Sequence, residues 1–210
     1  MSKNKMVFIA SLVCVVCAAL LVVSLFLPFT KANKDEAESI MSRPAYKAFD
    51  NDKLNYTSHD LVRISLFKYT RIYGTLGEEL WGDKISGIFY IAIFVLLAAF
   101  AALTLLFSAL KKPVAIIVFD VLFFALTLFN NSDYTSRRVI SENSSYQWGI
   151  AHTLFFVLTA IILAGAIAMI VFKMQEKKQM DKNGDELSAQ ALEEARKWTV
   201  EKQNTTLSSK

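Results

Sequence analysis

Residues 86–110 read "SGIFYIAIFVLLAAFAALTLLFSAL", and a second apolar run that begins "VAIIVFDVLFF" starts at residue 114. Only Lys111-Lys112-Pro113 separates the two runs. The first run has 25 residues without a charge, and about 20 helical residues suffice to cross the hydrocarbon core of a bilayer. A connection of three residues between two such helices places them side by side in opposite directions. The stretch therefore predicts a transmembrane helical hairpin.

Two further apolar blocks extend this hairpin to four spans. The chain has 210 residues and is 54% hydrophobic, more than the roughly 45 to 50% of soluble domains. The predicted spans are residues 6–29, 86–110, 114–130 and 148–172. We therefore predict an all-α integral membrane protein. Its four-transmembrane-helix bundle (residues 1–172) would carry a partly helical outer loop (residues 30–85) and a cytoplasmic helical tail (residues 173–210).

Two of the blocks allow a second interpretation. The block 114–130 is short for a span and could form a buried helix of a soluble protein, but its apolar neighbours favour a span. The first block follows Lys3 and Lys5, as in a secretory signal peptide, and residues 30–32 resemble a cleavage site. Its apolar run is longer than the usual 7 to 15 residues of a signal peptide. We therefore expect an uncleaved first helix.

The distribution of charge predicts the orientation. The two termini and the turn at residues 111–112 carry twelve basic and seven acidic residues, whereas the two loops on the other side have no net charge. Basic residues accumulate on the cytoplasmic side of membrane proteins. We expect a multi-pass protein of the cell membrane with both termini in the cytoplasm. Trp81 and Trp148 then lie at the outer membrane interface, where amphipathic rings are enriched.

Asp120 is the one charged residue in the four predicted spans. A carboxylate at that depth costs roughly 2.5 to 3.5 kcal/mol on insertion scales. Thr104 lies as far before the turn as Asp120 lies after it, so the two share a depth, and Thr127 and Asn131 share the helix face of Asp120. Asp120, Thr104 and Thr127 are therefore the candidate ligand- or ion-binding residues. Three roles are open: a polar latch inside the bundle, which we favour, a proton or ion site, and a contact with a charged helix of a partner.

The outer loop contains a second candidate site. Thr57 and Asp60 have the spacing of a capping box, and Gly74 suits the end of the helix that would follow. Apolar residues nearly surround this predicted helix, so we expect it to pack on the membrane or the bundle, or to bind a partner. The candidate interaction residues are Arg63, Leu66, Phe67, Lys68, Arg71, Trp81 and, in the tail, Trp198.

Two helix boundaries are also predicted. Residues 31–42 would continue the first helix outward until Pro44 stops it. In the tail, Asn183-Gly184 would end the fourth helix, and residues 185–203 would form a separate helix with a thin apolar stripe that includes Trp198. This last helix would be solvated or would dock on a cytoplasmic partner.

The sequence contains no phosphate-binding loop, no His/Cys cluster with metal-ligand spacing and no nucleophile elbow. We therefore expect no enzymatic activity, cofactor or metal, and the positive charge, which follows from membrane orientation, gives no case for nucleic-acid binding. The expected partners are the lipid bilayer and a membrane protein or a second copy of the chain. We expect an accessory, regulatory or scaffolding subunit of a larger membrane complex. The alternative is a small transporter or channel subunit that uses Asp120.

Four spans, a long first outer loop, a short second loop and inner termini together resemble the plan of claudin-like proteins. Leu80-Trp81-Gly82 is similar to part of the tryptophan motif in the first loop of that family. The cysteine pair of that motif is missing here, because Cys14 and Cys17 both lie in the first predicted span. The resemblance therefore implies a four-span topology and assigns no functional residue.

Overall fold

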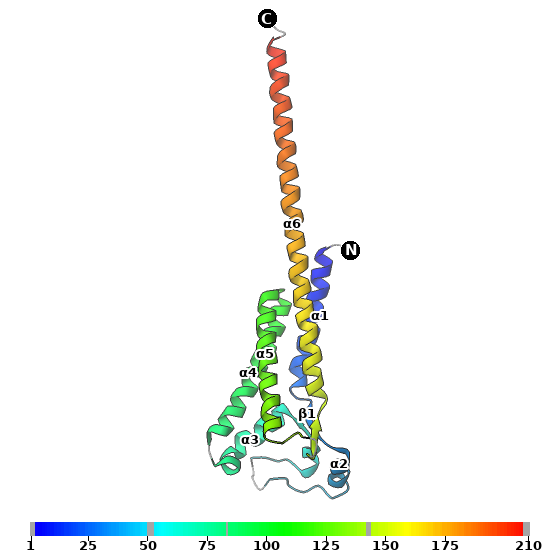
Figure 1. Cartoon of the computed structure of the whole chain (residues 1–210), viewed down its shortest axis with the longest axis vertical. Coiled ribbons are helices and arrows are strands. Elements are labelled where there is room, and N and C mark those ends of the chain that lie inside the picture. The colour runs from blue at the N-terminus through cyan, green and yellow to red at the C-terminus, as the bar shows by residue number, and fades with distance from the viewer. Residues whose placement is uncertain (1–2, 50–52, 83, 142–143, 208–210) are drawn as a thin grey trace.

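The computed structural model describes residues 3–49, 53–82, 84–141 and 144–207. Its bundle is a closed ring of four long helices, in which α1 and α5 each pack against both α4 and α6. Figure 1 shows neighbouring helices running in opposite directions and both termini at one end of the bundle. The four helices are α1 (Lys3–Ser24), α4 (Lys84–Ala109), α5 (Pro113–Ser136) and α6 (Ile150–Leu207). The predicted fold class is confirmed.

The surface of this bundle is apolar and its interior contains polar side chains. Phe8, Val95 and Val157 are each about half exposed, whereas Thr104, Ser108 and Asp120 are completely buried. Each of the four helices is also long and apolar enough to cross a membrane. A bilayer can cover such a surface at no cost, whereas water cannot. The third span has 24 residues, since α5 begins at Pro113 and continues to Ser136, beyond the predicted end at residue 130.

A small antiparallel sheet closes the end of the bundle opposite the two termini, which we call the outer end after the predicted orientation. Its strands are arranged in the order β2 (Arg63–Ser65), β1 (Pro28–Ala32) and β3 (Tyr146–Trp148). β1 follows α1 closely and β3 precedes α6 by one residue, so the sheet ties the outer ends of these helices together. The prediction that residues 31–42 continue the first helix is wrong. β1 intervenes, and Asn33 then starts a separate helix, α2 (Lys34–Met41), by accepting a hydrogen bond from the Glu36 N–H.

The helix predicted after the capping box is also different from the prediction. Asp60 accepts hydrogen bonds from the backbone and hydroxyl of Thr57, but the turn that they close is a short 3-10 helix, η1 (Ser58–Val62). The chain then pairs as β2 before α3 (Leu66–Trp81) begins. Gly74 lies inside α3, where it allows the close approach of α4 at Gly87. The glycine that ends α3 is Gly82, in the left-handed conformation with φ 73°.

The predicted break at Asn183-Gly184 is wrong as well, because α6 is one helix of 58 residues. A glycine inside a helix costs only about 1 kcal/mol relative to alanine, and helix-forming residues on both sides offset that cost. Figure 1 shows the second half of α6 projecting alone beyond the N-terminus of α1.

Candidate functional site

Asp120 lies in the interior of the bundle, on the buried face of α5. Thr127 lies on the same face, and Asn130 rather than Asn131 continues it toward the outer end. Thr104 of α4 is completely buried, like Asp120. All three candidate ligand-binding residues are therefore inside the protein. A partner helix in the surrounding lipid has no access to the Asp120 carboxyl, because that residue is 0% exposed.

Hydrogen bonds do not join these three residues to one another. Among the described residues, neither Asp120 oxygen nor the Thr104 hydroxyl has a hydrogen-bond partner. The Thr127 hydroxyl donates instead to the carbonyl of Phe123 at 3.0 Å, one turn earlier in its own helix. The carboxyl thus has acceptor atoms that the bundle leaves unused.

The four spans contain no basic side chain that could pair with Asp120. Cys14 of α1 lies within electrostatic range of the carboxyl. The Ser108 hydroxyl donates to the carbonyl of Thr104 at 2.7 Å, and the Ser11 hydroxyl donates to the carbonyl of Ser108 at 2.8 Å. Residues 6–24, 87–109, 113–136 and 150–172 contain no lysine or arginine. An ionised Asp120 would therefore be an uncompensated buried charge, which costs several kcal/mol.

The second candidate site, α3, packs over the outer end of the bundle. Leu66 is buried, and the Phe67 ring contacts Phe26, in the turn after α1, and Phe94 of α4 at centroid distances of 5.5 and 5.8 Å. The apolar surface that the sequence indicates is thus largely used within the chain. Arg63 stays exposed at the edge of an outer cleft of about 620 Å³ that α2 and η1 also line.

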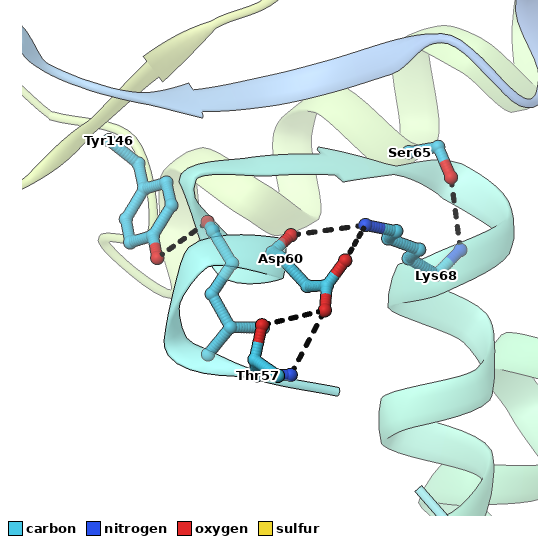
Figure 2. A network of polar contacts seen from close by, with 6 residues as sticks. Thr57, Asp60, Ser65, Lys68 and Tyr146 are labelled. Atoms are coloured by element: carbon cyan, nitrogen blue, oxygen red, sulfur yellow. Dashed lines mark hydrogen bonds and ion pairs between the residues drawn. The ribbon is translucent and has the colours of Figure 1, made fainter. Parts of the chain in front are cut away.

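Two of the predicted basic residues hold the loop onto α3. Figure 2 shows the ammonium of Lys68 next to Asp60, at 3.2 Å from the carboxylate. The guanidinium of Arg71 lies 5.5 Å from the centre of the Tyr56 ring and donates to the carbonyl of Lys53. The side chains of Trp81 and Trp198 lie outside the part of the chain that the structure describes.

The interactions of Asp60 predict that the stability of the outer cap depends on pH. The Thr57 N–H, its hydroxyl and Lys68 hold the pKa of Asp60 below its ordinary value of 3.8. A lowered pKa contributes stability that is present above the unfolded pKa and is lost as pH falls below about 3.8. We expect Asp60→Asn to destabilise the protein at pH 7 by about 1 kcal/mol or less, because the pair is partly exposed.

Thermal unfolding of Asp60→Asn and wild type at pH 7 and pH 3 tests this expectation. The difference should shrink at pH 3, which is below the ordinary pKa of 3.8, because the unfolded chain then gains a proton that the folded carboxylate resists. Asp181→Asn removes the same charge from the exposed surface of α6 and is the matched control. Equal pH dependence of the two variants would contradict the role of Asp60.

An aromatic cluster beneath α3 was not predicted from the sequence. The Tyr69 ring packs between the tilted rings of Tyr73 and Tyr134, at centroid distances of 4.2 and 4.5 Å. The Tyr90 hydroxyl donates to Asp133 at 2.9 Å, and Asp133 also pairs with Arg137 at 2.8 Å. The i, i+4 spacing of Asp133 and Arg137 is a sequence signal for that pair. The convergence of tyrosines from α3, α4 and α5 has no such local signal.

His152 also takes part in the outer aromatic packing and not in the polar interior around Asp120. Its ring stacks on Trp148 at a centroid distance of 4.0 Å, and Nε2 lies 3.2 Å from Nδ2 of Asn131. Phe29 of β1 contacts both rings edge-on. These contacts fix the junction between β3 and α6.

No family model, curated protein or solved structure matches this chain. The geometry therefore carries the functional argument alone. Among the described residues, no three His, Cys, Asp or Glu side chains gather in a way that could hold a metal ion. The interior contains one buried carboxyl, Asp120, that forms no hydrogen bond with the described residues. One end of the bundle carries the three-stranded sheet, and the other end carries the long projecting helix α6.

Proposed function

We propose that this multi-pass membrane protein is an accessory, regulatory or scaffolding subunit of a larger membrane complex. It would reside in the cell membrane with both termini in the cytoplasm. One observation carries the proposal: α6 leaves the bundle and continues as a single helix to Leu207. At 1.5 Å per residue, residues 173–207 reach roughly 50 Å beyond the bundle.

The composition of this projecting helix supports a role in binding a partner. Met174, Met180 and Leu192 of this helix are each more than half exposed. Helices without tertiary contacts are only marginally stable in water, so a partner that covers these side chains would stabilise the extension. The partner would be a membrane protein with a cytoplasmic part or a second copy of this chain. The +5 charge at this end of the molecule supports the cytoplasmic orientation.

Site-specific photo-crosslinking in intact cells tests this role. A photoreactive residue at Leu192 should give a discrete crosslinked protein, because the proposed partner covers the extension. A photoreactive residue at Val16, on the lipid-exposed side of α1, is the control and should crosslink mainly to lipid. Substituting Met180 by Gln should weaken the crosslink formed at position 192 several-fold without changing the thermal stability of the bundle. A crosslinking pattern that is unaffected by this substitution and identical at both positions would contradict the proposal.

A second function remains supported by one specific observation. The unpaired carboxyl of Asp120 is the kind of group that proton-coupled transporters carry inside their helices. A small transporter or channel subunit is therefore the alternative, and ion-dependent activity distinguishes it from the accessory role.

A further inference from the structure

A groove on the lipid-facing side of the hairpin lies at the end of the bundle where both termini lie. It has a volume of about 520 Å³ and is formed where α4 ends and α5 begins. Apolar side chains make up almost all of its walls, including Phe107, Val114, Val118 and Phe119. The rings of Phe107 and Phe119 stack in parallel at a centroid distance of 5.4 Å, which gives the groove a firm wall.

Lys112 is the one charged residue that lines this groove. It is exposed, and its ammonium forms no hydrogen bond or ion pair within the described part of the chain. Residues 105–119 contain no acidic residue that could neutralise it. The backbone N–H of Lys112 donates to the carbonyl of Phe107 at 3.0 Å, so the position of Lys112 at the end of the groove is fixed by the turn.

The two neighbouring lysines, Lys111 and Lys173, make contacts outside the groove. The ammonium of Lys111 lies 5.1 Å from the centre of the Phe8 ring, on the side of α1. The ammonium of Lys173 donates to the carbonyl of Lys111 at 2.6 Å. Lys112 is therefore the one lysine of this end of the bundle that lines the groove between α4 and α5.

We propose that this groove binds an anionic phospholipid of the surrounding membrane, with one acyl chain along Val118 and Phe119 and the headgroup phosphate at Lys112. An acyl chain matches an apolar groove that opens to the membrane, and a phosphate matches a free ammonium at the level of the headgroups. A soluble anion would satisfy Lys112 but would leave the apolar walls unused. A zwitterionic lipid would fill the groove but would bring its own cation next to the lysine.

Native mass spectrometry of the full-length protein, released from neutral detergent with added lipid, tests the site. The probes are phosphatidylglycerol and phosphatidylcholine with identical acyl chains. We expect wild type to retain phosphatidylglycerol in preference, and Lys112→Gln to weaken that retention about fivefold. Lys178→Gln, which removes the same charge from the exposed α6 extension, should leave it unchanged.

A second variant tests the groove apart from the charge. Val118 is 49% exposed and lines the groove, so Val118→Trp fills it without touching Lys112. This variant should also lose phosphatidylglycerol while keeping its thermal stability in lipid-free detergent. Equal losses for Lys112→Gln and Lys178→Gln would overturn the proposal in favour of diffuse attraction. Full retention by Val118→Trp, or equal binding of the two lipids to wild type, would overturn it as well.

Discussion

Gly149→Ala is expected to destabilise the protein by about 3 kcal/mol, the upper part of the range for an overpacked site. Gly149 connects β3 to α6, and its N–H donates to the carbonyl of Phe29 at 2.7 Å. A Cβ at this position would collide with the carbonyl group of Pro28. Backbone atoms of a paired strand have no alternative rotamer, so relief requires that β1 and β3 move apart. The junction that ties α1 to α6 would then open.

Gly82→Ala is the matched control for this variant. Gly82 has φ 73°, and no atom lies within 4 Å of the Cβ position. An alanine there bears only the strain of the left-handed conformation, roughly 1 to 2 kcal/mol. Thermal unfolding of both variants in the same detergent, followed by circular dichroism, gives the comparison. A loss of stability at Gly149 that is no larger than the loss at Gly82 would contradict the close approach of β1 to the start of α6.

The sequence predicts the bundle well because its signals are local. An apolar run long enough to cross a bilayer, followed by a turn of three residues, leaves few other structures for residues 86–136. The least accurate span prediction, the third, differs from the structure in its end, because the apolar pattern stops near residue 130 while α5 continues to Ser136. Ser132, Asp133 and Tyr134 look like loop residues, but Tyr134 is buried in the aromatic cluster and extends α5.

The outer cap is harder to predict, because its strands are short and come from distant segments. β2 contains three residues, and its partner strand β1 lies about 30 residues earlier in the sequence. The local signal at Thr57 is real, since the capping hydrogen bonds form. Pairing of Arg63 with Lys31 of β1 nevertheless ends the turn that Thr57 starts. Tertiary pairing overrides local propensity here.

The candidate site around Asp120 was also predictable only in part. Asp120 is conspicuous in the sequence because a carboxyl interrupts an apolar run, and the structure buries it with Thr104 and Thr127. The hydrogen bonds of the neighbouring hydroxyls were not predictable, since a serine or threonine in a helix can donate to its own helix or to another group, depending on its side-chain rotamer. Ser108 and Thr127 donate to carbonyls of their own helices, and this choice leaves Asp120 without a donor.

A second large change in stability, of the opposite sign, is expected at Asp120. Asp120→Leu removes a carboxyl that forms no hydrogen bond with the described residues and whose insertion costs roughly 2.5 to 3.5 kcal/mol. We therefore expect the variant to be more stable than wild type, by about 2 kcal/mol, because leucine also adds apolar contacts in the interior. Thermal unfolding in detergent measures this change. A strongly destabilised leucine variant would contradict this expectation and would favour the latch hypothesis, in which the carboxyl supports the bundle.

Functional assays of Asp120 variants distinguish the accessory role from the transporter alternative. Asp120→Asn keeps the shape of the side chain and removes its ability to ionise, whereas Asp120→Glu keeps that ability. Under the accessory role, the asparagine variant should give the same crosslinked partner at position 192 as wild type, and reconstituted wild type should move no more protons than empty liposomes. Under the transporter alternative, a pH-sensitive dye inside the liposomes should report proton uptake by wild type, reduced uptake by the glutamate variant and none by the asparagine variant. A stable asparagine variant that loses uptake would show that the protein retains this costly carboxyl for its proton and not for its shape.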